Sequence, residues 1–192
     1  MLGHNAVIAA IAEGKIVVDP FVPKHLGPNS LDLRLGDWCV RQRSSSNLKH
    51  YKNKYSLLDP IDPSLIWNEP TEIPDGILML RPGELVLAHT MERVGTYEDI
   101  AGELSSRSSM MRMGIAVCVD AGLGDVGYDS KWTLEIYNHT SLAIGIPVGA
   151  RVCQMKFHRV ENSGLTYQEK GGTYGSRDDW KPSDMLPRSS LF

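Results

Sequence analysis

The sequence predicts a mainly β fold, either a barrel or a sandwich, with a short helix at the N-terminus. Two observations support this prediction. Short apolar or alternating runs recur along the chain, and glycine or proline stands in nearly every gap between them, as is typical of short strands joined by tight turns. The 192 residues, with 42% hydrophobic and 22% charged side chains, have the size and composition of one ordinary globular domain.

The elements follow in chain order. A helix is predicted over residues 4–13, because its apolar side chains recur on one face and Gly14 follows as a stop residue. The β-branched run 15–18 predicts the first strand, and leucines alternate with polar residues over 30–35. The remaining predicted strands are 77–80, 85–89, 115–119, 132–137, 142–146 and 152–157.

Two segments show no clear periodicity. Residues 41–75 are polar and contain several prolines, so we expect an excursion on the surface. From Ser163 onward the chain is rich in glycine, serine, aspartate and proline, which predicts a domain over 1–162 and a flexible tail over 163–192. The 3 cysteines, at 39, 118 and 153, are far apart and are expected to be core thiols of a reducing compartment.

Charge and motifs exclude several classes of protein. A net charge of −3 argues against a nucleic-acid-coating protein, and no apolar run or N-terminal pattern predicts a membrane span or a signal peptide, so we expect a cytoplasmic location. The His-x-Glu and Pro-Cys-x-x-Cys pairs of zinc nucleobase deaminases are missing, and the 6 histidines lack metal-ligand spacing. We therefore expect hydrolysis without zinc, or binding alone.

The segment 105–114 crowds serines and arginines in front of an apolar strand. Serines at the start of a helical turn leave backbone N–H groups and hydroxyls free to bind an anion, and an arginine side chain can donate two parallel hydrogen bonds to phosphate oxygens. This indicates phosphate or carboxylate recognition. A capped surface turn with solvated arginines is the alternative.

A second segment, 119–128, carries glycines at 122, 124 and 127 between Asp120 and Asp125. The glycines allow a hairpin to bring backbone against a ligand, and the aspartates offer acceptors, although the segment on its own is also compatible with a plain turn. In the next strand Glu135 stands among apolar residues. If it is desolvated there, its pKa rises toward a value useful for proton transfer, whereas a wet face is the alternative.

Taken in order, residues 14–16, 29–36, 107–114, 121–128, 133–138 and 147–154 resemble the dCTP deaminase branch of the dUTPase superfamily. This resemblance implies a distorted β-barrel, the dUTPase-like β-clip, assembled as a homotrimer with active sites at subunit interfaces that the C-terminal tail closes. It also implies dCTP as the substrate, Mg²⁺ on its phosphates and no zinc. The products would be dUTP and ammonia.

The resemblance also implies roles for individual residues. Glu135 would deprotonate the attacking water and protonate the pyrimidine. Ser108 and the backbone carbonyl of Ala121 would hold that water, and Arg112 would orient Glu135. The residues implied to bind substrate are Arg107, Ser109, Asp120, Gly122, Tyr128, Gln154, Tyr167, Lys170 and Tyr174, with Tyr128 beside the deoxyribose.

Residues 120–123 read Asp-Ala-Gly-Leu, which resembles the bifunctional deaminase–dUTPases that go on to release pyrophosphate and leave dUMP. Asp125 stands where dUTPases hold the water that attacks the phosphate chain. Asp120 replaces a threonine beside the base, which suggests a preference for a modified cytosine. Two alternatives stay open: a dUTPase without deaminase activity, and a non-catalytic deoxynucleotide-binding regulator.

Overall fold

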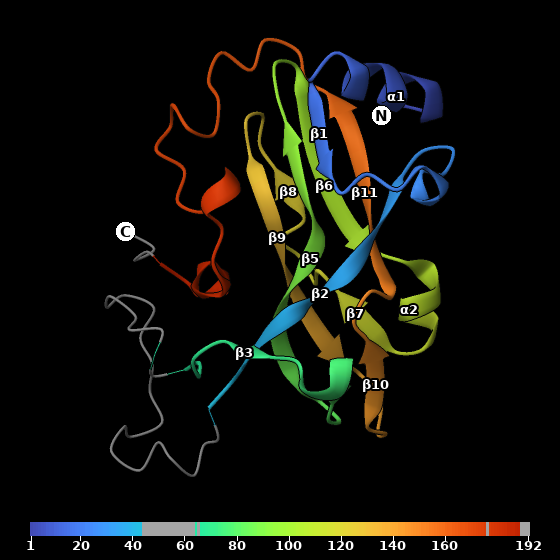
Figure 1. Ribbon diagram of the computed structural model, residues 1–192, viewed down its shortest axis with the longest axis vertical. Helices are drawn as coiled ribbons and strands as arrows, with labels where there is room; N and C mark the ends of the chain where they lie inside the picture. Colours follow the sequence, from blue (N-terminus) through green and yellow to red (C-terminus); the bar gives the residue numbers. More distant parts are fainter. Residues whose placement is uncertain (44–63, 65, 176, 189–192) are drawn as a thin grey trace.

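The computed structural model describes residues 1–43, 64, 66–175 and 177–188. Within these residues one curled sheet dominates (Figure 1). Its nine strands are β1 (Ile16–Asp19), β2 (Leu31–Arg41), β3 (Thr71–Glu72), β5 (Leu85–Thr96), β6 (Ile100–Ser106), β7 (Ile115–Val117), β8 (Leu123–Gly124), β9 (Asp129–Asn138) and β11 (Arg151–Arg159). The strand order is β7-β9-β5-β2-β11-β6-β8, with β1 paired to β5 and β3 to β2. The prediction of a mainly β fold is confirmed.

The remaining elements are short. In the described part, β4 (Ile77–Leu80) and β10 (Ile144–Pro147) form a separate antiparallel pair. The helices are α1 (His4–Ala12) and α2 (Ser108–Arg112), and the single 3₁₀ turns are η1 (Pro23–His25), η4 (Pro74–Gly76), η5 (Arg177–Asp179) and η6 (Pro182–Met185). None of the helices in the described residues is long and apolar enough to span a membrane.

Alternation along the strands forms the core. The leucines of β2 at 31, 33 and 35 are buried, and so are Trp132, Leu134 and Ile136 of β9. A smaller cluster joins Val40, Trp67 and Leu87 to Met185 from the C-terminal segment. The interior therefore extends beyond the predicted domain boundary at residue 162.

Several predicted strands differ in extent from the observed ones. The strands predicted over 30–35 and 85–89 continue to Arg41 and Thr96. Each continues beyond an irregularity of the β-bulge type, at which the register of its pairing shifts. The strand predicted over 115–119 ends at Val117, since Cys118 has a positive φ of 62°. The strand predicted over 142–146 starts at Ile144 instead.

The strand β6 was not predicted, because glycine and serine interrupt its apolar pattern, yet it pairs with β11 along its whole length. Most of the polar excursion at 41–75 lies outside the described residues. Cys39 and Cys153 are buried as predicted, whereas Cys118 is only partly buried.

Candidate functional site

Glu135 lies in the middle of β9, opposite Leu87 of β5. Its side chain is partly buried, and its Oε2 atom is enclosed without a hydrogen-bond partner among the described residues. Burial raises the pKa of this carboxyl above the ordinary value of 4.5. Glu135 is therefore a desolvated carboxylate, as expected, and does not lie on a solvent-exposed face of the strand.

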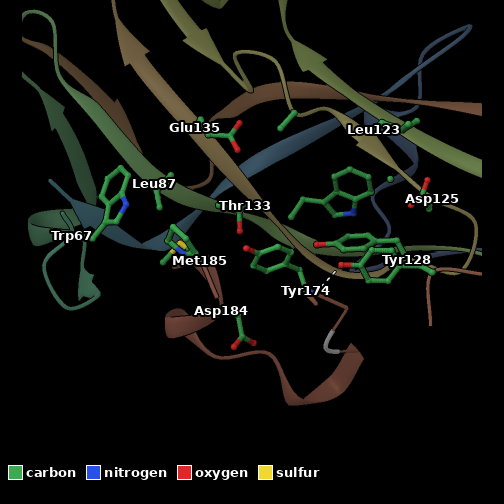
Figure 2. Close-up of a pocket in the computed structure, with 15 residues that line it drawn as sticks. Trp67, Leu87, Leu123, Asp125, Tyr128, Thr133, Glu135, Tyr174, Asp184 and Met185 are labelled. Carbon is green, nitrogen blue, oxygen red and sulfur yellow. Dashed lines mark hydrogen bonds between the residues drawn. The ribbon is translucent and has the colours of Figure 1, made fainter. Parts of the chain in front are cut away.

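Glu135 forms part of the wall of a cavity of about 390 Å³, which Figure 2 shows. The strand β9 contributes Thr133 as well, and Tyr128 lies at one end of the cavity (Figure 2), where its ring meets that of Trp132 edge-on at 4.8 Å between centroids. Asp125 lies toward this end and Trp67 toward the other (Figure 2). The full lining is Trp67, Leu87, Ala121, Leu123, Gly124, Asp125, Tyr128, Trp132, Thr133, Glu135, Tyr167, Tyr174, Asp184, Met185 and Pro187.

A second cavity, of about 510 Å³, shares only Ala121 and Glu135 with the first. Its other lining residues are Leu85, Val119, Asp120, Tyr137 and His139. It is therefore largely apolar, with two carboxylates in its wall. Glu135 stands between the two cavities, so groups bound on either side come within its reach.

The glycines of the segment 119–128 pack the hairpin onto the barrel. A Cβ atom at Gly122 would lie 2.2 Å from the Leu104 carbonyl oxygen, and one at Gly124 would lie 2.1 Å from the Trp132 ring. The Gly127 φ angle is +88°, a value that favours glycine. The sequence suggested that these glycines bring the backbone against a ligand. In the structure, Gly122 and Gly124 allow the hairpin to pack against the Leu104 backbone and the Trp132 ring.

Asp125 sits in this hairpin with its side chain exposed at the edge of the first cavity. It also lines a third cavity of about 430 Å³, to which Lys170 and Tyr167 contribute. Asp125, Leu123 and Tyr167 thus form the wall that the cavity of Glu135 shares with the space lined by Lys170.

The C-terminal segment lies on the barrel of its own chain. The Tyr167 ring meets the Tyr128 ring edge-on at 5.2 Å, and the Tyr167 hydroxyl accepts a 2.8 Å hydrogen bond from the Tyr174 backbone N–H. Farther along, the Trp180 ring packs 4.4 Å from the ring of the fully buried His89. The segment therefore forms part of the cavity wall; that it is flexible stays a prediction.

The serine–arginine turn lies elsewhere. Ser108, Ser109 and Arg112 are exposed on α2, and none of them lines the cavities of Glu135. In Figure 1, α2 and the C-terminal segment lie on opposite sides of the barrel. Arg107 and Gln154 also lie outside both cavities. One chain thus brings together only part of the predicted site.

Several lining residues were not predicted from the sequence, notably Trp67, Thr133, Asp184 and Met185. Two of these come from the C-terminal segment and one from the polar excursion, where no periodicity marked them. Asn138, part of the motif that supported the resemblance, is structural: its amide donates to the Leu80, Arg81 and Leu142 carbonyls. Among the described residues, no cluster of three or more His, Cys, Asp or Glu side chains could hold a metal ion.

Comparison with known proteins gives a consistent result. A model of the dCTP deaminase-like family matches residues 1–160. The chain is 36% identical to a protein of Methanopyrus kandleri named "dCTP deaminase, dUMP-forming", over 96% of this chain and 95% of that one. It is 34% identical to a protein of the same name from Dictyoglomus thermophilum, over 90% and 88%, and 29% identical to a "dCTP deaminase" of Thermomicrobium roseum, over 100% and 96%.

Among solved structures, the fold is similar to that of 2'-deoxycytidine 5'-triphosphate deaminase from Agrobacterium tumefaciens, with a TM-score of 0.61 and 21% identity. The match covers 83% of this chain and 48% of that one, so this chain spans about half the length of the Agrobacterium protein. At this identity the likeness supports the fold alone.

Proposed function

The chain belongs to the dCTP deaminase-like family, and on this premise we propose that it deaminates dCTP without zinc and then releases pyrophosphate to leave dUMP. The observation that carries the proposal is Glu135, a desolvated carboxylate with an unpartnered oxygen in the wall of a cavity. A buried, unpaired acceptor costs folding free energy. Such a group is therefore a candidate for a catalytic acid or base.

The first step needs a base near C4 of the cytosine ring. Glu135 takes a proton from a water as the water oxygen bonds to C4, and passes that proton to the ring nitrogen N3. The proton of the new C4 hydroxyl group then moves to the exocyclic amino group, the bond between C4 and that amino nitrogen breaks, and ammonia leaves while C4 becomes a carbonyl. Its raised pKa brings the carboxyl closer to the pKa of the groups with which it exchanges protons. Ala121 lines both cavities beside Glu135, which fits its carbonyl as an acceptor that orients the water.

Asp125 fits the second step. It lies toward the Tyr128 end of the first cavity and also lines the third cavity, to which Lys170 contributes. A carboxylate there can orient a water for attack on the phosphate chain, while Lys170 binds the phosphates. Mg²⁺ usually binds through one or two carboxylates plus phosphate oxygens and water. Asp125, whose side chain is exposed at the edge of the first cavity, fits such a substrate-borne ion, which would neutralise phosphate charge.

The lining of the first cavity contains carboxylates but no lysine or arginine, so within the described residues of one chain the triphosphate lacks cations there. We propose that a neighbouring copy supplies them in a homotrimer.

Arg112 lies on α2 between Met111 and Met113, which are 47% and 54% exposed. This surface matches the second cavity, which is apolar and carries Asp120 and Glu135.

The test is a complete product analysis. Purified protein is incubated with dCTP and Mg²⁺, and ammonia, dUTP, dUMP and pyrophosphate are quantified over time. We expect ammonia and pyrophosphate in equal amounts while dUMP accumulates. Accumulation of dUTP would contradict the second step, and cleavage of added dUTP without ammonia from dCTP would indicate a dUTPase instead. Binding without any product would indicate a regulator.

The same assay examines Asp120, an exposed carboxylate that shares the second cavity with Glu135. The proposed preference for a modified cytosine predicts faster ammonia release from 5-methyl-dCTP or 5-hydroxymethyl-dCTP than from dCTP. Equal rates across the series would remove this part of the proposal.

A further inference from the structure

A cluster of charged side chains lies outside the cavities of Glu135, where β2 and β11 meet the start of α2. Its centre is Asp32, whose side chain is 16% exposed. Asp32 Oδ1 lies 3.2 Å from Arg107 Nε, and Asp32 Oδ2 accepts a hydrogen bond of 3.1 Å from Arg151 Nη1. Arg107 Nη1 donates a further hydrogen bond of 3.0 Å to the Arg151 carbonyl. One carboxylate therefore holds two guanidiniums beside each other.

Strand register explains why these groups meet. Asp32 on β2 lies opposite Gln154 on β11, which in turn lies opposite Ser105 on β6. Directly opposed residues of antiparallel strands present their side chains on the same face, and Gln154 Nε2 donates to Ser105 Oγ at 3.4 Å. Arg107 follows at the N-cap of α2. Two residues predicted to bind substrate, Arg107 and Gln154, thus border the same carboxylate.

The cluster carries an excess of positive charge. The buried carboxylate of Glu92 on β5 is already paired with Arg34, whose backbone N lies 2.9 Å and whose Nε lies 2.6 Å from its oxygens. Asp32 alone therefore faces both Arg107 and Arg151. Within the described part of the chain, Arg107 Nη2 makes no hydrogen bond, and the two side chains are 27% and 44% exposed. One edge of a fixed guanidinium is thus open to an anion.

We infer that Asp32 is a positioning residue for the triphosphate of the substrate, acting through Arg107 and Arg151 without touching the nucleotide. The inference rests on the proposed function, in which a neighbouring copy supplies cations for the triphosphate, and on the substrate-binding role that the resemblance implies for Arg107. A guanidinium fixed in advance loses less conformational freedom on binding, and its planar fork matches phosphate oxygens. Two guanidiniums sharing one carboxylate also keep a net positive charge, which a one-to-one ion pair would not.

The test uses inorganic tripolyphosphate, titrated calorimetrically into the full-length protein, together with steady-state kinetics on dCTP. Asp32→Asn should weaken tripolyphosphate binding about tenfold and raise KM for dCTP by a similar factor, with kcat changed less than about threefold. The matched control is Asp99→Asn, which removes the same charge from an ion pair with Arg159. Asp99 directly precedes β6, at the end of that strand away from the Asp32 cluster. The control variant should leave both constants within about twofold.

Unchanged tripolyphosphate binding by Asp32→Asn would overturn the inference, because it is the result expected if Asp32 only joins the strands. Tighter binding would also overturn it, because it is the result expected if the carboxylate only repels phosphate. Should Asp32→Asn fail to fold, Arg151→Gln replaces it, since the Arg151 side chain is 44% exposed. That variant should weaken binding at least about threefold, and unchanged binding would overturn the inference. The titration needs no turnover. If the wild-type protein releases no ammonia, but its tripolyphosphate binding is weakened by Asp32→Asn, the proposed function alone is refuted.

Discussion

At the scale of single residues, the chemistry of Glu135 follows from its place on β9. Alternation along the strand directs Leu134 and Ile136 into the core and turns Glu135 toward the cavities. The glutamate is thus shielded by the hairpin and the C-terminal segment, and no cation compensates it among the described lining residues. Desolvation therefore dominates its titration.

Replacement of Glu135 by glutamine should abolish ammonia release, because the amide can neither accept a proton from water nor donate one as an acid. The shape of the cavity is kept, so dCTP should bind with an affinity within about threefold of the wild type. Ammonia release and calorimetric binding of dCTP measure the two effects. Retained turnover would refute proton transfer by Glu135.

The same variant has an effect on the free energy of unfolding whose size depends on pH. The folded-state pKa of Glu135 lies above its unfolded value, so the stability linked to its protonated form is present below the unfolded pKa and is lost as pH rises through the folded pKa. Glutamine is uncharged, so it does not carry the cost of burying an ionised carboxylate at high pH. The melting temperature of Glu135→Gln should exceed that of the wild type at pH 8, and the difference should shrink toward pH 4. Thermal unfolding at both values checks this, and the opposite trend would contradict the desolvation.

Asp125 tests whether the two hydrolytic steps use separate waters. Asp125→Asn should reduce pyrophosphate release by about 100-fold, while ammonia release changes only severalfold, because Asp125 lies apart from Glu135 along the cavity. The measurement is the ratio of dUTP to dUMP formed from dCTP. Equal loss of both activities would argue against separate water positions.

At the scale of elements, periodicity predicted the strands whose two faces differ most, such as β9 and the start of β2. It failed for β6, because glycine and serine interrupt the pattern and pairing with β11 stabilises the strand instead. It also failed to extend strands past bulges, since a bulge reverses the alternation on which the prediction depends. The glycine-rich hairpin was recognised, but its packing against Leu104 and Trp132 could not be read from spacing.

The hairpin should tolerate no side chain at Gly122. A methyl group there would meet the backbone carbonyl of Leu104, which cannot rotate away, so Gly122→Ala should destabilise the protein by about 1–3 kcal/mol and displace Ala121. Denaturant unfolding measures the change. Gly3→Ala is the control, because its added methyl would lie 3.6 Å from the nearest backbone atom, an ordinary contact. Equal stability of the two variants would contradict this account.

At the scale of the whole molecule, the candidate site is divided. The C-terminal segment and α2 lie on opposite sides of the barrel (Figure 1). Residues of the C-terminal segment line the cavity of Glu135, whereas Ser108 and Arg112 are exposed on α2. The sequence identified members of both groups, because each stands in a recognisable motif. It could not show which residues share a cavity within one chain, since that depends on strand order. It also missed Asp184 and Met185, which chain folding returns to the cavity without any local pattern.

Subunit mixing provides the decisive test of this division. Co-expression of Glu135→Gln and Arg112→Ala chains should recover activity that neither variant has alone, because a site then combines Glu135 of one copy with Arg112 of the next. In a closed ring with random assembly, about a quarter of the sites are intact, so about a quarter of the wild-type rate is expected. Glu135→Gln co-expressed with Tyr128→Ala is the control: both residues line the same cavity of one chain, so mixing restores no site. Failure of the first pair to exceed this control would exclude a site that combines Glu135 of one copy with Arg112 of the next.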